Sequence, residues 1–191
     1  MVSLIDAIKS DFARKSGHYF LVDTFFERYV KTALQLGTLA VVVYRFGAWA
    51  EHIRFVPARW SCLVLYHFFN LLSETLTGIH INRKVPIGDG FIIHNFSCIR
   101  INAETIGDNF TVNQGVTVDH DWRRNGRPAI GNNVFLGSGS KVLGHITLGD
   151  NVVVAANALV IDSIPDNCTV VGVPARIISR DASSNYLQLK K

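Results

Sequence analysis

Apolar residues change their spacing near residue 75, and the change divides the chain into two patterns. Before that point, residues such as Phe25, Tyr29 and Ala33 recur at helical spacing, with few glycines between them. This pattern predicts an α-helical N-terminal region over residues 1–75, built from about three to five helices. Pro57 predicts a break between two of them, because proline cannot continue a helix without losing a hydrogen bond.

After residue 75 a period of six residues replaces the helical one. Aliphatic residues stand at every sixth position, with one inserted residue after Ile99, and a glycine often follows them. A helix repeats every 3.6 residues and a strand every 2, so a sustained period of six indicates a solenoid of short strands and corners. The twelve aliphatic positions are Ile87, Ile93, Ile99, Ile106, Val112, Val118, Ile130, Leu136, Val142, Leu148, Val154 and Val160.

Three such hexapeptides make one coil of a three-sided prism, and stacked coils bury aliphatic side chains that no single repeat could bury alone. Twelve repeats give about four coils. We therefore predict a mainly β fold, a parallel β-helix over residues 76–178, and a C-terminal tail over residues 179–191.

One polar segment interrupts the repeats without shifting their phase. It covers residues 119–129, and the position midway between Val118 and Ile130 is Arg124, which cannot be a core residue. We expect this segment to protrude as a loop, and such loops often carry binding or catalytic residues.

Composition and charge narrow the ligand classes. The formal net charge is +4, which suits an anionic ligand such as a nucleotide phosphate, but Lys and Arg are scattered, so nucleic acid is not predicted. Cys62, Cys98 and Cys168 form no CxxC pair and no metal spacing with histidines. We expect free thiols in a reducing cytoplasm, and no metal site.

Two apolar stretches of the N-terminal region are candidates for contact with a membrane. Residues 32–44 and 60–73 carry no Asp, Glu, Lys or Arg, but both fall short of the roughly 18 to 20 residues that cross a bilayer. We predict buried helices for both. A peripheral membrane contact stays open as an alternative, because Arg45, Arg54 and Arg59 flank the aromatic residues.

Several motifs together resemble one family. The repeats, the stretch NQGVTV, the run LGSGSKVLGHITLGDNVVVAANALV and the closing VVGVPARII resemble the serine acetyltransferase branch of the hexapeptide acyltransferases, over about residues 70–178. The resemblance implies a left-handed β-helix that packs as a homotrimer. It also implies acetyl-CoA as co-substrate, bound in the groove between adjacent prisms, and a histidine that deprotonates the acceptor hydroxyl.

The position that matches the family's catalytic histidine is His94. Imidazole has an unperturbed pKa of about 6.5, so it can act as a neutral base near pH 7. His94 also stands next to the inward-facing Ile93, where most repeats have a small residue. We therefore predict that His94 is the general base, with a surface or inter-subunit histidine as the alternative.

Three positions depart from the family's pattern for serine. His80 stands where the family has the Asp paired with the catalytic histidine, and Ile93 where an Asp precedes that histidine. Arg127 stands where the family has a second, acceptor-contacting histidine. Relatives with such substitutions resemble O-acetyltransferases that modify the sugars of surface polysaccharides.

The remaining candidate site residues fall into three groups. In the predicted loop, the carboxylate of Asp119 could orient the imidazole of His120 as a second catalytic pair, unless His120 is simply a solvated residue. We expect His80, Asn95 and Arg127 to contact the acceptor, and for His80 contact with the catalytic base or a structural role are the alternatives. We expect small residues of the late coils and two basic side chains to contact the coenzyme: Gly137, Ser138, Gly139, Ala155, Ala156, Lys141 and Arg176.

The function predicted from the sequence is transfer of the acetyl group of acetyl-CoA to a hydroxyl of a sugar or surface-polysaccharide acceptor, by direct attack on the thioester. One alternative is a serine O-acetyltransferase of cysteine biosynthesis. A second alternative, of another class, is a β-helix that binds ligands without catalysis.

Overall fold

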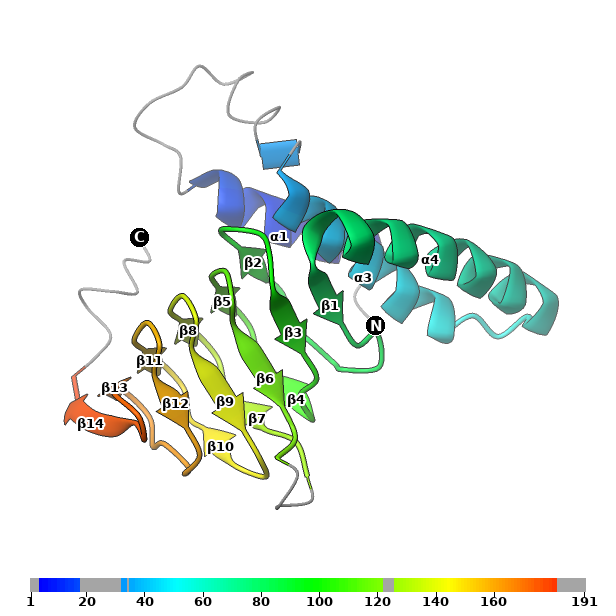
Figure 1. Ribbon diagram of the computed structural model, residues 1–191. Coiled ribbons are helices and arrows are strands. Elements are labelled where there is room, and N and C mark those ends of the chain that lie inside the picture. The colour runs from blue at the N-terminus through cyan, green and yellow to red at the C-terminus, as the bar shows by residue number, and fades with distance from the viewer. Residues whose placement is uncertain (1–3, 18–31, 34, 122–125, 182–191) are drawn as a thin grey trace.

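The computed structural model describes residues 4–17, 32–33, 35–121 and 126–181. Three helices, α1 (Leu4–Gly17), α3 (Leu36–Glu51) and α4 (Val56–Thr77), precede all the described strands (Figure 1). The strands are β1 (Ile79–Ile81), β2 (Ile92–Ile93), β3 (Ile99–Ile101), β4 (Thr105–Ile106), β5 (Thr111–Val112), β6 (Thr117–Asp119), β7 (Ala129–Ile130), β8 (Phe135–Leu136), β9 (Lys141–Leu143), β10 (Thr147–Leu148), β11 (Val153–Val154), β12 (Leu159–Val160), β13 (Thr169–Val171) and β14 (Arg176–Ser179).

Most strands pair with the third strand further along the chain, and the pairs β1-β3 and β11-β13 complete three sheets. The orders are β1-β3-β6-β9-β12, β4-β7-β10 and β2-β5-β8-β11-β13, all parallel, and β14 closes the third sheet in an antiparallel pair with β13. A mainly β fold with parallel sheets and a helical N-terminal region is thereby confirmed.

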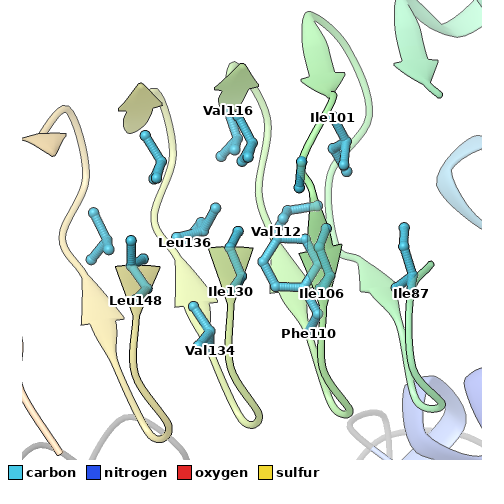
Figure 2. Close-up of a cluster of buried hydrophobic side chains, with 14 of the residues drawn as sticks. Ile87, Ile101, Ile106, Phe110, Val112, Val116, Ile130, Val134, Leu136 and Leu148 are labelled. Carbon is cyan, nitrogen blue, oxygen red and sulfur yellow. The ribbon is translucent and has the colours of Figure 1, made fainter. Parts of the chain in front are cut away.

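The aliphatic positions of the six-residue period lie between these sheets. All twelve are at most 7% exposed. They stack from coil to coil, as in the row Val112, Leu136 and Val154, and several of them are drawn in Figure 2.

The predicted register was wrong at one position. Ile101, not Ile99, is the partner of Val118, while Ile99 pairs with Ile79. The corner before β3 is longer than in the other repeats, and two of its residues, Ser97 and Cys98, have positive φ angles of 103° and 53°. Ile99 and Ile101 are both buried, since alternate residues of a strand share a face, and this hid the extra length.

A ladder of asparagines builds the corner that leads into the third sheet. Asn109, Asn133, Asn151 and Asn167 all have φ between 55° and 60°, a left-handed conformation that asparagine tolerates better than most residues. Each of the first three donates a side-chain hydrogen bond to the next, at 2.9–3.0 Å. The paired motifs GDN and GNN of the sequence therefore mark this corner.

The helices cover the first coil through a buried ion pair. Arg45 of α3 donates to both carboxylate oxygens of Asp11 of α1, at 2.8 and 3.0 Å, and to the backbone carbonyls of Ile87 and Gly88. Asp11 also accepts the backbone N–H of Phe91 at 2.8 Å. Arg45 is buried by these contacts, so the expectation that it flanks membrane-facing aromatics was wrong.

Helix α4 packs beside α3, and one face of it is left uncovered. Leu63 and Tyr66 are buried, and Gly47 of α3 makes room for the ring of Tyr66, which lies 2.3 Å from where a Cβ would be. The prediction that residues 60–73 form a buried helix was therefore wrong, because α4 exposes most of its large apolar side chains. Among the described residues, no helix is both long and apolar enough to cross a membrane.

Candidate functional site

His94 lies at the corner that follows β2. Its backbone N–H donates to Val112 at 3.0 Å, which aligns it with Asn113 of the next coil. Asn113 in turn donates to Leu136, and Gly137 donates to Val154, so the same corner carries Gly137 and then Ala155 on the later coils. The structure thus brings His94 into one column with two of the predicted coenzyme residues.

A second column runs beside the first. The side-chain amide of Asn95 donates to Oε1 of Gln114 at 3.0 Å, and the backbone carbonyl of Ser138 accepts the N–H of Asn157 on the following coil. Ala156, the residue after Ala155, aligns with Ser138 in this second column. Gln114 was not among the predicted residues, although the motif NQGVTV contains it.

The glycines of this corner have a structural reason of their own. A Cβ on Gly137 would lie 2.6 Å from the backbone nitrogen of Ala156, so a side chain there would push the coils apart. Gly139 has a φ of +72°, and a Cβ would lie 2.2 Å from Oδ1 of Asn157. Small size at these positions is therefore required by the fold, whether or not a coenzyme approaches.

The two basic residues predicted to bind coenzyme phosphates differ in their surroundings. Lys141 on β9 donates from Nζ to the backbone carbonyl of Gly115 at 2.6 Å. Gly115 belongs to the coil that follows the coil of His94, so this hydrogen bond holds the Lys141 side chain near the same corner. Arg176 on β14 lies opposite Val171, is exposed, and donates from Nη1 to the adjacent backbone carbonyl of Ala175 at 3.2 Å.

A second polar cluster surrounds Asp119 at the end of β6. Arg100 donates to Oδ2 of its carboxylate at 2.5 Å, and Asn102 to Oδ1 at 2.7 Å. The ring nitrogen Nδ1 of His120 lies 2.8 Å from Oδ1. Burial alone would raise the pKa of Asp119, but the hydrogen bonds from Arg100, Asn102 and His120 outweigh it and lower the pKa to about 2.

Arg127 belongs to this second cluster, since its guanidinium donates to Oδ1 of Asn102 at 3.1 Å. The predicted protruding loop is described only at its two ends, and Arg124 lies outside the described residues. Arg100 and Asn102 were missed in the sequence, although the alternation IRIN points Arg100 outwards from β3 and places Asn102 directly after that strand.

The two histidine candidates do not meet within one chain. In the sheet β1-β3-β6-β9-β12, His94 lies before the start of β3 and His120 lies after the end of β6, so they lie at opposite ends of the strands. Within one chain, the two predicted histidines are therefore kept apart.

His80 on β1 is oriented by an unpredicted partner. Its Nδ1 lies 2.7 Å from Oε1 of Glu74 near the end of α4, and that oxygen also accepts the side-chain amide of Asn70. The hydrogen bond engages Nδ1 and leaves Nε2 for a different partner. In register, His80 lies beside Arg100, so it links the start of the sheet to the Asp119 cluster.

The described residues contain no group of three or more His, Cys, Asp or Glu that could hold a metal ion. Cys62, Cys98 and Cys168 are free thiols. The side chains at both clusters suit acid–base chemistry and binding of a polar or anionic ligand.

Three comparisons relate the chain to known proteins. Residues 127–162 match the family described as "Bacterial transferase hexapeptide (six repeats)". A serine acetyltransferase of Synechococcus elongatus is 35% identical over 147 residues (75% of this chain, 57% of the relative), and one of Staphylococcus aureus is 37% identical over 138 residues (65% of each). A crystal structure whose title names a serine O-acetyltransferase from Brucella melitensis superimposes with a TM-score of 0.72 at 25% identity, covering 91% of this chain and 66% of that one.

The chain thus spans less than two thirds of the length of these relatives. Their names agree with the predicted enzyme class, an acetyl-CoA-dependent O-acetyltransferase. They contradict the predicted acceptor, a sugar or surface polysaccharide, and support the alternative, serine. Residues 127–162 thus match the hexapeptide-repeat transferase family, and the chain is similar to relatives named serine acetyltransferase.

Proposed function

We propose that the protein is a serine O-acetyltransferase, which transfers the acetyl group of acetyl-CoA to the hydroxyl of L-serine and releases coenzyme A. The observation that carries this proposal is that His94 shares a corner with the small residues of the later coils, in a chain whose aligned relatives are named serine acetyltransferases. That corner offers a base and, along the same edge, a surface that an extended ligand can approach closely.

In the proposed reaction His94 acts as the general base. Its imidazole takes the proton of the serine hydroxyl while the oxygen attacks the thioester carbon of acetyl-CoA. When the C–S bond breaks, the proton passes from His94 to the leaving thiolate, giving O-acetylserine and coenzyme A. A positioned general base contributes about 10²- to 10⁴-fold in rate.

The acceptor side of the proposal rests on His80, Asn95 and Arg127, with Asp119 and His120 as a second acid–base pair. The side chain of Asp119 is 10% exposed and is held by three neighbours, so it can keep the ring of His120 in one orientation. The Glu74 carboxylate does the same for His80, which supplies an oriented imidazole for a zwitterionic acceptor.

The coenzyme side rests on Gly137, Ser138, Gly139, Ala155 and Ala156, with backbone groups of the corner as the expected contacts. Lys141 and Arg176 are the proposed partners of the phosphates.

Assembly and location are parts of the same proposal. We infer a left-handed prism of about four coils that assembles as a homotrimer, because the parts of the site around His94 and His120, at opposite ends of one sheet, would then come from different copies. Three free thiols fit a reducing compartment such as the cytoplasm.

The test is release of free thiol from acetyl-CoA by the purified full chain, with L-serine compared with D-serine, L-threonine, nucleotide sugars and oligosaccharides. We expect L-serine to be turned over fastest. Turnover of a sugar with no turnover of L-serine would refute the proposed acceptor.

The role of His94 is tested separately with His94→Ala. We expect kcat to fall about 10²- to 10⁴-fold, while coenzyme A still binds in calorimetry. His67→Ala, an exposed histidine on α4, is the control and should keep wild-type activity. A His94→Ala variant with near wild-type kcat would show that another group is the base.

A further inference from the structure

Helix α4 presents an uncovered apolar face. The side chains at every fourth position, Val56, Trp60, Val64, Phe68, Leu72 and Leu76, form a row that winds across the exposed side of the helix, and each is between 48% and 67% exposed. We call these six residues the apolar row. Monomeric proteins rarely expose contiguous apolar surface on this scale unless it meets a partner or a membrane.

The face around the apolar row is broad and uncharged. Leu65, Phe69 and Leu71 extend it on both sides, and the exposed polar residues among them, Ser61, His67 and Thr75, carry no carboxylate, ammonium or guanidinium. A helix that packs on one neighbour typically buries a stripe somewhat wider than 100°. The apolar face of α4 extends well beyond such a stripe, which suits a fluid apolar phase better than a single helix of a second copy.

The two charged residues of α4 do not interrupt this face. Glu74 is turned towards His80, and Arg59 is bound to Glu51 of α3 at 2.6 Å. Both charges on the helix therefore have a protein partner, whereas the side chains of the apolar row stay largely exposed in the described part of the chain.

Positive charge gathers where α4 begins. Arg54, Arg59, Arg83 and Lys84 lie in or against this end, whereas Glu51 is the acidic residue that meets them, and it binds both Arg59 and Arg83. One carboxylate cannot neutralise four cations, so a positive surplus borders the apolar row on the side of Trp60. Aromatic residues beside basic ones are typical of segments that rest at the boundary between lipid headgroups and acyl chains.

We propose that α4 is the docking surface of this protein for a bilayer that contains anionic phospholipids. The helix lies in the plane of the bilayer, with the middle of the apolar row, from Trp60 to Leu72, towards the upper acyl chains and Arg54 and Arg59 at the headgroups. The 22 residues of α4 extend for about 33 Å, so the contact runs along the surface. In Figure 1, α3 and α4 lie at the end of the coil stack nearest β1, so the remaining coils can point away from the lipid.

The first test is sedimentation of the full chain with vesicles. The probes are phosphatidylcholine alone and phosphatidylcholine with about 30% phosphatidylglycerol, each at low and at high salt. We expect most of the protein to pellet with the anionic vesicles at low salt, and several-fold less with the neutral vesicles or at high salt, because salt screens the basic end.

The second test uses matched variants. The double variant Trp60→Ser, Phe68→Ser should lower the affinity for anionic vesicles at least tenfold. The control is Val173→Ser, Ile178→Ser, which changes two side chains near the C-terminal end of the stack that are 69% and 63% exposed, against 65% and 63% for Trp60 and Phe68. We expect the control to bind vesicles as the wild type does, and both double variants to keep the wild-type circular dichroism spectrum.

Two results would overturn the proposal. One is wild-type protein that stays in the supernatant with anionic vesicles at low salt, and the other is a Trp60→Ser, Phe68→Ser variant that binds as well as the control. If light scattering also shows that this variant forms a smaller assembly than the wild type without lipid, the apolar row is covered by a second copy instead. Acetyl transfer in lipid-free solution is measured in parallel, so loss of docking can be told from loss of the proposed reaction.

Discussion

The prism and the helices above it use apolar residues in opposite ways. In the prism, the aliphatic residue of each repeat meets its equivalent on the next coil, and all twelve are buried. In α4, an equally regular row of apolar side chains stays 48% to 67% exposed in the described part of the chain. In a solenoid, each coil buries the apolar side chains of its neighbours. A helix at the end of the stack packs on its neighbour with one face, and its other apolar face stays exposed unless another molecule covers it.

The two regions are also held by different kinds of hydrogen bonds. The prism corners repeat the same short contact from coil to coil, as in the asparagine ladder. The helices are joined to the first coil by a few long-range contacts centred on Asp11 and Arg45. Loss of one hydrogen bond should therefore lower the free energy of unfolding only slightly in the prism corners. Loss of the ion pair should lower it much more.

Truncation of one phenylalanine in each region gives the largest contrast. Phe110 is fully buried and stacks on Phe91 with ring centroids 5.6 Å apart, whereas Phe68 is 63% exposed. We expect Phe110→Ala to lower the free energy of unfolding by about 3–5 kcal/mol and Phe68→Ala by about 0.5 kcal/mol or less. Urea denaturation measures both. Equal losses would mean that α4 is covered by other parts of the chain.

Removal of the buried guanidinium of Arg45 should cause the next largest loss in the free energy of unfolding. Arg45→Met leaves the carboxylate of Asp11 buried without its partner, so we expect a loss of about 3 kcal/mol in the free energy of unfolding. The double variant Asp11→Leu, Arg45→Met should recover part of that loss, since both charges are gone. If the double variant loses the sum of the two single losses, the ion pair is not what joins the helices to the prism.

Much of the prism could be predicted from the sequence because each position of the six-residue period has one structural role. The shift at Ile101 could not, because Ile99 and Ile101 are both aliphatic and both point inward, so the pattern looks the same in either register. The uncovered face of α4 could not be predicted for a different reason. An apolar run of 14 residues indicates only that the residues avoid water, not which neighbour covers them.

In the candidate site, too, positions set by the six-residue period could be predicted, and contacts between different elements could not. His94 and the small residues of the later coils were expected on one surface because the period fixes which residues share a corner. Glu74, Arg100 and Asn102 were not expected, since their contacts depend on how the end of α4 meets β1 and on which coil lies beside β6. Sequence spacing predicts neighbours within a repeat better than neighbours between elements of different period.

The Asp119 cluster of the prism should make the free energy of unfolding depend on pH. The pKa of Asp119 is about 2 in the folded chain, against roughly 3.9 when unfolded. Its depressed pKa therefore stabilises the fold above pH 4 by about 2 kcal/mol, and this contribution is lost as the pH falls from about 4 through 2. Urea denaturation of Asp119→Asn should show a smaller loss of stability over that range than the wild type. The control Asp162→Asn, on an exposed residue of another coil, should follow the wild type.

The smallest expected effect comes from the last member of the asparagine ladder. Asn167 has a φ of 60° and accepts one side-chain hydrogen bond from Asn151 at 2.9 Å. Asn167→Gly removes the hydrogen bond but keeps a residue that adopts this φ freely, so we expect a loss of a few tenths of a kcal/mol in unfolding free energy. Asn167→Ala removes the bond and strains the backbone, for a loss of about 1 kcal/mol. The difference between the two variants isolates the backbone contribution. If glycine costs as much as alanine, the side-chain ladder rather than the left-handed turn holds this corner, and the repeated GDN and GNN motifs must be explained by hydrogen bonding between coils.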